Sequence, residues 1–465
     1  MAEADPSTPT AQTDAPPIPT SRMALLFTVM LVTAAGNTAM QSVMPSIGTA
    51  LGVQDFWISL AYSWSALLWV ICAPIWARRS DRRGRKSMMA LGLTGFILSM
   101  GLCGLALWAG LSGYLGALAT LITFAAARSL YGLFGSAAPP AVQAYVAART
   151  PRSERTNALS LIASSFGLGT VIGPVLAPLL VFPFLGIGLT GPFISFGLIG
   201  VVALVLLRLR LPDDEPRFAA RGQTVAYSGT SDAPAETDDD LGPHADEPSG
   251  EESRGETQSA DDAARLRWFE PRLRPWVLAG LVGGHAQAMI MGIAGFLVLD
   301  RLGLRGQPEE GAALVSLVLV FGALATLLAQ WGLIPRFRIG PRAATLSGMS
   351  VAAFGTAVLG FAGDVFALSL GFAIASLGFG LFRPGTTAGT SLAVTRAEQG
   401  QASGIVASVA GASFIYAPAV GVWLYNTNAP VAFGLIITLC LAVTGIGWRG
   451  LARDASLTVD RETFE

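Results

Sequence analysis

Charged residues are scarce in this chain, and those that occur are unevenly distributed. Only 13% of the 465 residues are charged and 52% are hydrophobic, whereas a soluble domain carries roughly 25% charged residues. Fifteen of the 31 acidic residues lie between Asp213 and Asp262, and none of the 31 lies in the middle of an apolar run. A lipid bilayer requires such long uncharged stretches and a water-soluble fold does not. The composition therefore predicts a polytopic membrane protein.

Histidine and cysteine are also scarce, which argues against several kinds of chemistry. The two histidines are His244 and His285, and the three cysteines, Cys72, Cys103 and Cys440, all fall inside apolar runs. These positions match neither a metal-ligand spacing nor a disulfide framework. The chain also lacks the G-x-x-x-x-G-K-[ST] loop that binds nucleotide phosphates. We therefore do not expect an enzyme or an ATP-driven pump, and we expect no metal, no cofactor and no nucleic-acid partner.

Apolar runs of about 20 residues recur along the chain, and each can cross a bilayer as a helix that rises 1.5 Å per residue. Backbone polar groups in lipid must be satisfied within their own segment, which favours helices. The runs lie at residues 23–50, 56–77, 87–109, 115–147, 157–181, 190–208, 276–299, 311–333, 343–362, 365–394, 401–424 and 430–448. The sequence thus predicts an all-α membrane protein with twelve transmembrane helices in two pseudo-symmetric six-helix bundles.

Composition divides the chain into five parts. Residues 212–264 are rich in Asp, Glu, Gly, Pro and Ser and cannot bury a core, so we expect a disordered cytoplasmic linker there. The other parts are a disordered cytoplasmic N-terminal tail (1–21), a first six-helix bundle (22–211), a second bundle with an interfacial lead-in (265–450) and a cytoplasmic C-terminal tail (451–465). The two bundles resemble each other, because "RSERTNALSLIAS" (152–164) parallels "RAEQGQASGIVAS" (396–408). A duplicated six-helix unit with a binding site between its halves is a transporter architecture.

Cations gather in the loops that follow the even-numbered runs. The segment "RRSDRRGRK" (78–86) follows the second run, and further arginines lie at 149–155, at 336–342 and at Arg396. The positive-inside rule places these loops and both termini in the cytoplasm. We expect a monomeric multi-pass protein of the bacterial inner membrane.

Four segments carry a resemblance to a known family. "PIWARRSDRRGRK" (74–86) resembles the loop signature of the major facilitator superfamily, although Ala77 stands where that signature begins with glycine. "RSLYGLFGSAA" (128–138) resembles the arginine-centred motif of its fourth helix, and "GLGTVIGPVLAP" (167–178) resembles the G-x-x-x-G-P motif of its drug/proton antiporters. "GNTAMQSVMPSIGTALG" (36–52) resembles the first helix of drug exporters. The resemblance implies the major facilitator fold, alternating access and proton-coupled efflux of small organic molecules.

Two groups of residues in these motifs are candidates for conformational roles. A charged cluster at the ends of two helices can latch the halves in one state, or it can serve only to fix the topology. The latch candidates are Asp81, Arg82, Gly84, Arg85 and Lys86. Asp81 can pair with a neighbouring arginine or cap the third helix. Small residues allow close helix contact and proline bends a helix, so the second group is Gly132, Gly169, Gly173 and Pro174.

Arg128 and Arg383 lie deep in their apolar runs. An intramembrane arginine costs at least about 2.5–3.5 kcal/mol on insertion scales and normally faces a cavity or a partner. We therefore expect both guanidinium groups to face a central chamber, with helix packing as the alternative. The resemblance implies a role for Arg128 near proton coupling. The two arginines together also suit a carrier of an organic anion or metabolite, acting as an importer, exchanger or uniporter.

The first helix departs from the family pattern. Many proton-coupled exporters of this family carry a carboxylate at the position that matches Gly36, which is followed here by Asn37. The candidates for moving a proton are therefore Arg128, His285, whose side-chain type titrates near neutrality, and Asp300. Polar or aromatic groups expected to line the substrate cavity are Asn37, Gln41, Tyr131, Gln143, Gln287 and Arg383.

Overall fold

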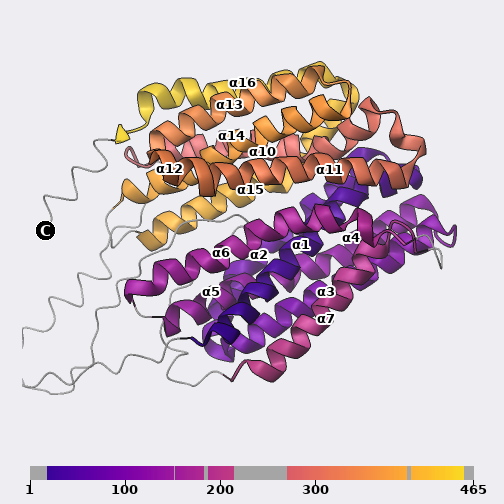
Figure 1. The fold of residues 1–465 in the computed structure, drawn as a ribbon, viewed down its shortest axis with the longest axis horizontal. Coiled ribbons are helices and arrows are strands. Elements are labelled where there is room, and N and C mark those ends of the chain that lie inside the picture. The colour runs from indigo at the N-terminus through magenta and orange to yellow at the C-terminus, as the bar shows by residue number, and fades with distance from the viewer. Residues whose placement is uncertain (1–17, 151, 183–186, 214–269, 395–398, 455–465) are drawn as a thin grey trace, which may run out of the picture.

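The computed structural model describes residues 18–150, 152–182, 187–213, 270–394 and 399–454. The expected N-terminal tail and acidic linker lie almost entirely outside these residues, as does most of the expected C-terminal tail. Nearly all regular structure in the described part is helical (Figure 1). Eleven helical stretches there are long and apolar enough to cross a membrane, and a twelfth helix has a shorter apolar stretch, Ser164–Leu176. The predicted all-α membrane fold is confirmed.

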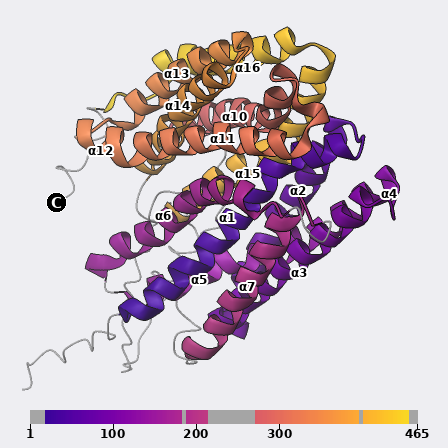
Figure 2. The same cartoon turned by 45° about the vertical axis from the view of Figure 1, so that its right-hand side comes forward.

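The helices fall into two bundles that follow each other in sequence (Figures 1 and 2). The first bundle contains α1 (Thr20–Ala50), α2 (Asp55–Arg83), α3 (Arg85–Leu111), α4 (Ala117–Leu133), α5 (Ala138–Arg149), α6 (Arg152–Leu176) and α7 (Gly191–Arg210). The second contains α10 (Arg274–Arg301), α11 (Pro308–Leu327), α12 (Ile334–Phe337), α13 (Pro341–Phe361), α14 (Val365–Leu392), α15 (Gln399–Thr427) and α16 (Ala429–Gly450).

Two runs that the sequence predicts as single helices are interrupted. The run 115–147 forms α4 and α5, which are separated by a 3-10 turn at Gly135–Ala137. Pro139 and Pro140 explain the break, because proline lacks the backbone N–H of a helix interior but is tolerated in a first turn. In the run 311–333, the π-helical segment Leu328–Leu333 joins α11 to α12. Breaks of this kind inside a span are typical of functional or bent regions.

The basic turn is narrower than the sequence predicts. Helix α2 continues to Arg83, so most of the charged segment 78–86 lies in its last turns. Only Gly84, with a φ of 87°, separates α2 from α3, which begins at Arg85. Glycine adopts this positive φ without steric cost, which explains its place in the motif. Asp81 therefore lies inside α2, and Gly84 occupies the N-cap position of α3.

The two ends of the molecule differ in how the bundles meet. We call the end with Arg83 and Arg85 the basic end, and the end at which α2 begins the Asp55 end. Buried side chains near the Asp55 end belong to one cluster that includes Ile47 of α1 and Leu299 of α10. At the basic end each bundle has a cluster of its own, one with Leu26, Met89 and Leu207 and the other with Leu273, Val277 and Ile405. The ribbons agree with this difference, because the bundles are inclined to each other and spread apart toward the basic end (Figure 1).

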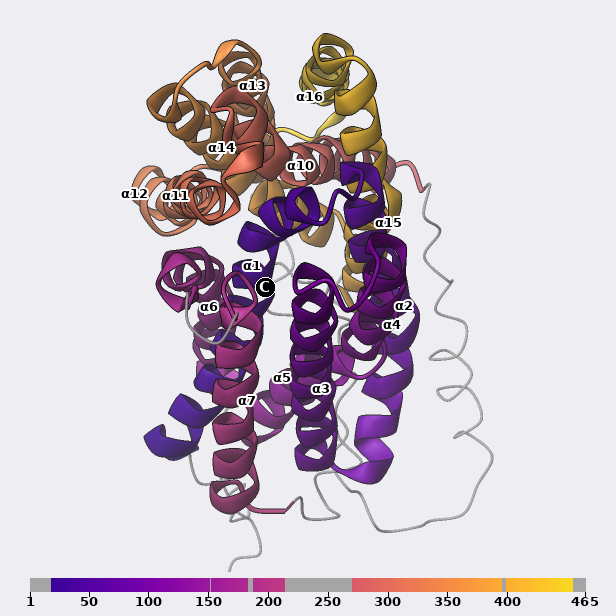
Figure 3. The same cartoon turned by 90° about the vertical axis from the view of Figure 1, so that its right-hand side faces the viewer.

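The main contacts between the bundles are those of α2 with α15, α1 with α11 and α6 with α11, and α1 makes a smaller contact with α10. Figure 3 looks from the Asp55 end and shows the second bundle above the first, with α1, α6 and α15 at the level where they meet. These contact helices carry several of the candidate residues, so the interface between the bundles positions the site.

Candidate functional site

Arg128 lies in the middle of the first bundle and is enclosed by α1, α2 and α4. Only 3% of its surface is exposed. Its Nη2 donates to Oδ1 of Asn37. The guanidinium carbon lies 4.5 Å from the ring centroid of Tyr131 and 5.5 Å from that of Tyr62. An amide and two aromatic faces therefore stabilise this cation, with the cation–π geometry expected of arginine. Arg128 is thus enclosed by side chains in this conformation, and its access to a central chamber stays a prediction.

The polar groups around Arg128 are incompletely paired. Its Nε and Nη1 are buried and have no hydrogen-bond partner among the described residues, and the same holds for the Tyr62 hydroxyl. A buried ion normally needs both a counter-charge and a full set of hydrogen bonds. This site provides one amide acceptor and no described carboxylate, so the guanidinium of Arg128 has no described counter-charge.

Asn37 occupies the position opposite Arg128, and Gly36 does not. A Cβ at Gly36 would lie 2.5 Å from the Phe96 ring and 3.2 Å from Cβ of Phe196, so that position faces the helices behind α1. Asn37 is half-buried and contacts the guanidinium. The first-helix side chain that contacts Arg128 is therefore that of Asn37.

His285 is held between α10 and α15. Its Nδ1 lies 2.7 Å from the carbonyl oxygen of Leu281, and its Nε2 makes a hydrogen bond with the Tyr416 hydroxyl. A carbonyl oxygen can only accept, so Nδ1 carries the hydrogen and Nε2 accepts from Tyr416; this tautomer is inferred from the bonding partners. The imidazole ring could take up a proton at Nε2 and then donate to the same hydroxyl. Both protonation states would thus keep two hydrogen bonds.

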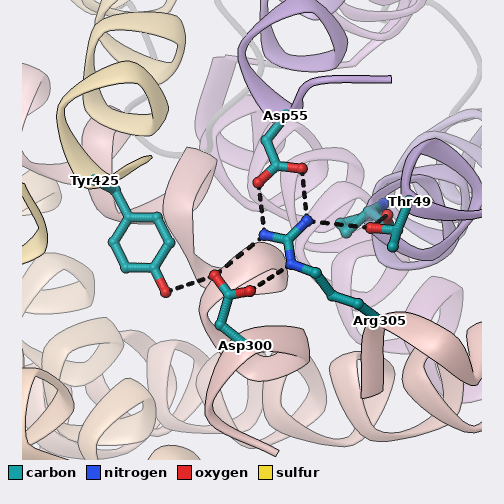
Figure 4. Close-up of polar contacts among 6 residues, drawn as sticks. Thr49, Asp55, Asp300, Arg305 and Tyr425 are labelled. Carbon is teal, nitrogen blue, oxygen red and sulfur yellow. Dashed lines mark hydrogen bonds and ion pairs between the residues drawn. The ribbon is translucent and has the colours of Figure 1, made fainter. Parts of the chain in front are cut away.

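Asp300 lies at the Asp55 end, where it belongs to a cluster of polar groups from both bundles (Figure 4). Arg305 donates to both oxygens of Asp300, with a distance of 3.1 Å from Nη2 to Oδ2. The same guanidinium donates to both oxygens of Asp55, at 3.0 Å from Nη1 and 2.7 Å from Nη2. Tyr425 donates to Oδ2 of Asp300 at 2.9 Å. The hydrogen bonds to Asp55 and Asp300 raise the pKa of Arg305, so this cation is permanently charged.

Asp55 and Arg305 are functional candidates that the sequence analysis misses. They lie 250 positions apart, at the start of one helix and just after the end of another. In the sequence both read as charges at the edge of an apolar run. One signal was present in the sequence: Arg301 and Arg305 are the cations of a connection that otherwise carries few of them, and Asp300 lies next to it at the end of its apolar run.

The latch motif is only partly described. The side chains of Asp81 and Arg82 lie outside the described part of the structure. Arg85 is buried, and Nζ of Lys86 lies 3.0 Å from Oδ1 of Asp213, a residue beyond the end of α7. The Asp213 side chain is 94% exposed, so this ion pair contributes little to stability. A latching role for these residues remains a proposal.

The glycines of the fifth-helix motif lie where α6 crosses α1. A Cβ at Gly169 would lie 2.6 Å from Cβ of Ala34, and one at Gly173 would overlap the carbonyl oxygen of Ala35. Pro174 lies inside α6 next to this contact. Gly132 has the same relation to α2, because its Cβ would lie 2.5 Å from the carbonyl oxygen of Ser65.

The expected cavity residues divide into two groups. Tyr131 is buried and packs with Trp69 at a centroid distance of 5.1 Å, so it is part of the bundle core in this conformation. The others are half-buried: Asn37, Gln41, Gln143, Gln287 and Arg383. The three glutamines make no side-chain hydrogen bond to any described residue. Half-buried amides without protein partners are suitable contacts for a polar solute.

Comparison with known proteins establishes the family. Residues 26–338 match the sequence profile of the Major Facilitator Superfamily, and the chain belongs to that family. It is therefore a transporter and not an enzyme. The predicted superfamily and fold are confirmed.

The relatives indicate the range of functions within the family. The chain is 30% identical over 198 residues to the probable actinorhodin transporter of Streptomyces coelicolor, which covers 42% of this chain and 32% of that protein. It is 30% identical over 156 residues to the multidrug resistance protein MdtG of Yersinia enterocolitica, which covers 32% of this chain and 34% of the relative. The chain thus matches about a third of the length of these curated relatives.

Two solved structures resemble the whole fold. The human organic anion transporter MFSD10 (TETRAN) has a TM-score of 0.59 at 18% identity, with 92% of this chain and all of that chain covered. A bacterial homologue of the human lysosomal transporter Spinster, in an inward-facing and unoccupied conformation, has a TM-score of 0.61 at 14% identity, with 96% and 97% covered. At these identities the likeness supports the fold alone.

Proposed function

We propose that this transporter exports small organic molecules of the drug type by alternating access, with proton movement as the driving force. The proposal is supported by relatives that carry the names of multidrug and antibiotic transporters and by the α6 glycine motif, which packs directly on α1. We further propose that both termini and the basic end lie in the cytoplasm and that the protein acts as a monomer in a bacterial inner membrane.

The observation that carries the proton coupling is the environment of His285. This imidazole lies inside a membrane-spanning helix, and both of its ring nitrogens have partners, Leu281 and Tyr416, that permit a change of protonation. Histidine is the side chain suited to exchange a proton in the physiological range. Arg128 acts differently in this proposal, because it is enclosed in this conformation and donates to Asn37. It positions Asn37, which is half-buried and can contact a solute.

A second candidate function is the transport of organic anions. Each Asp and Glu of the described helices lies in a first or last turn, so the deep charged side chains there are Arg128 and Arg383. Such an interior attracts anionic groups and repels lipophilic cations. A solved relative of the same fold is named as an organic anion transporter.

Reconstituted vesicles with an imposed pH gradient test both candidates. Lipophilic cations, neutral drugs and aromatic carboxylates are supplied separately, and their gradient-driven accumulation is measured between about pH 6 and pH 8. The leading proposal expects uptake of drugs into inverted vesicles and a loss of its pH dependence in His285→Gln, because glutamine keeps the hydrogen bonds without titrating. Arg208→Gln, which changes an exposed arginine at the end of α7, serves as the control.

The outcomes separate the candidates. Transport of carboxylates alone establishes the anion carrier and rejects the drug exporter. Transport with an unchanged pH profile in His285→Gln removes that residue from the coupling. Compounds that bind should also raise the melting temperature of the purified protein, since ligands of the folded state stabilise it.

A further inference from the structure

Among the described residues, Arg305 makes the side-chain hydrogen bonds that connect the two bundles. Its partners in the first bundle are Asp55 at the start of α2 and Thr49 at the end of α1, which lies 3.4 Å away. Its partner in the second bundle is Asp300, which Tyr425 also holds (Figure 4). The cluster lies at the Asp55 end, where buried side chains of both bundles form a common core.

The cluster is asymmetric with respect to the two bundles. Arg305, Asp300 and Tyr425 all belong to the second bundle and would move together if the bundles separated here. Asp55 belongs to the first bundle and is 4% exposed, and its described side-chain partner is Arg305. Separation at this end therefore breaks the pair of Asp55 with Arg305 and leaves the pair of Asp300 with Arg305 intact.

The charges of the two states follow from this asymmetry. In the closed state the two carboxylates of Asp55 and Asp300 share the guanidinium of Arg305. In an open state Arg305 would stay neutralised by Asp300, while Asp55 would meet water at the N-terminus of α2, where a negative charge is favourable. Asp55 thus stabilises closure, and Asp300 lowers the electrostatic cost of opening.

We propose that Asp55, Asp300 and Arg305 form an ionic lock between the bundles, with Arg305 as the shared cation. Asp55 and Asp300 have opposite effects on the equilibrium between the closed and the open lock. The inference rests on the alternating access proposed above, and it adds two residue roles to it. Asp55 holds the Asp55 end closed. Asp300 remains paired with Arg305 when Arg305 separates from Asp55. The lock can therefore open without leaving the guanidinium of Arg305 unpaired.

Distance measurements between spin labels at both ends of the protein test the lock. One label pair, Tyr114→Cys with Phe366→Cys, spans the bundles at the Asp55 end, where both side chains are exposed. A second pair, Ser87→Cys with Ser347→Cys, reports on the basic end. The three native cysteines are replaced by alanine, and the protein is studied in lipid nanodiscs by pulsed electron resonance.

The two carboxylate variants should shift the populations in opposite directions. Asp55→Asn should raise the open-to-closed ratio at the Asp55 end by roughly tenfold, the ratio that corresponds to about 1.4 kcal/mol. Asp300→Asn should lower that ratio, because Arg305 would then have no charged partner after leaving Asp55. The open-to-closed ratio at the basic end should shift in the opposite direction in each variant. In an Arg305→Gln background, Asp300→Asn should cause no further shift, since it acts through Arg305.

Two matched controls lie at the same end of the molecule. Asp364→Asn removes a carboxylate that caps α14 within the second bundle, and Arg301→Gln removes an arginine that donates to the carbonyl of Gly360 in the same bundle. Neither should change the distances between the bundles. Shifts of the same sign for Asp55→Asn and Asp300→Asn, or no shift in either, would overturn the lock. The distances require no substrate, so a failure to find any transported compound counts against the proposed function and leaves this test intact.

Discussion

At the scale of single residues, the main feature is a buried cation that is stabilised without a carboxylate. Arg128 has an amide and two aromatic rings as neighbours, and two of its nitrogens have no described acceptor. An aspartate at position 37 would make a titratable ion pair there. Asparagine makes a contact whose charge does not change with pH. The described surroundings of Arg128 in the first bundle therefore contain no carboxylate that could pair with it.

The contact between Asn37 and Arg128 can be tested through stability. Asn37→Leu removes the described hydrogen-bond acceptor of Arg128, and an unsatisfied buried donor costs about 1–3 kcal/mol. We expect a lower melting temperature for this variant in detergent at pH 7. Asn37→Asp keeps the acceptor and adds a counter-charge, so it should unfold at or above the temperature of the original protein. Equal melting temperatures for all three proteins would show that the contact contributes nothing to stability.

At the scale of elements, the close crossing of α1 and α6 requires glycine, which has no side chain, at the contact positions of α6. The carbonyl oxygen of Ala35 occupies the position that a Cβ of Gly173 would need, and Thr38 donates to the carbonyl of Gly169 at 3.2 Å. Backbone atoms cannot rotate away as side chains can. The G-x-x-x-G spacing therefore sets the distance between these two helices.

Substitution at this crossing should destabilise the protein. Gly173→Ala forces α6 away from α1, and overpacking of this kind typically costs about 1–3 kcal/mol. Gly101→Ala is the matched control, because nothing lies within 4 Å of its added Cβ on α3. In a helix interior, alanine is favoured over glycine by roughly 0.5–1 kcal/mol. Thermal unfolding should thus shift down for Gly173→Ala and slightly up for Gly101→Ala, and a shift of both in the same direction contradicts the close approach.

The helices also show which features of the fold the sequence pattern is sufficient to predict. Eleven of the twelve predicted runs contain described helical stretches with the length and hydropathy of a membrane span, and the run 157–181 contains the shorter apolar helix Ser164–Leu176. The breaks after α4 and α11 do not follow from hydropathy, since the average hydropathy of both interrupted runs stays high across the break. Pro139 and Pro140 indicate a bend in the first of them, but a window of hydropathy averages over that signal.

At the scale of the whole molecule, the family motifs predict the fold well and the relations between the bundles poorly. The lock at Arg305 joins positions 250 residues apart, and nothing in the local pattern of either segment specifies its partner. The enclosure of Arg128 has the same origin, because depth along a helix is visible in the sequence and the face of the helix is not. Contacts within one span are thus predictable, whereas contacts that distinguish conformational states need the assembled bundles.

The orientation of the molecule decides which compartment the lock controls. The basic end carries the clustered arginines, so the positive-inside rule predicts that it lies in the cytoplasm and that the Asp55 end lies outside. The native cysteines are replaced by alanine, and one new cysteine is introduced at a time. Tyr114→Cys marks the Asp55 end and Ser87→Cys marks the basic end. A membrane-impermeant maleimide applied to intact cells should label Tyr114→Cys and spare Ser87→Cys until the membrane is opened. Labelling of Ser87→Cys in intact cells would show that the orientation is the opposite one. The pair of Asp55 with Arg305 would then close the cytoplasmic side.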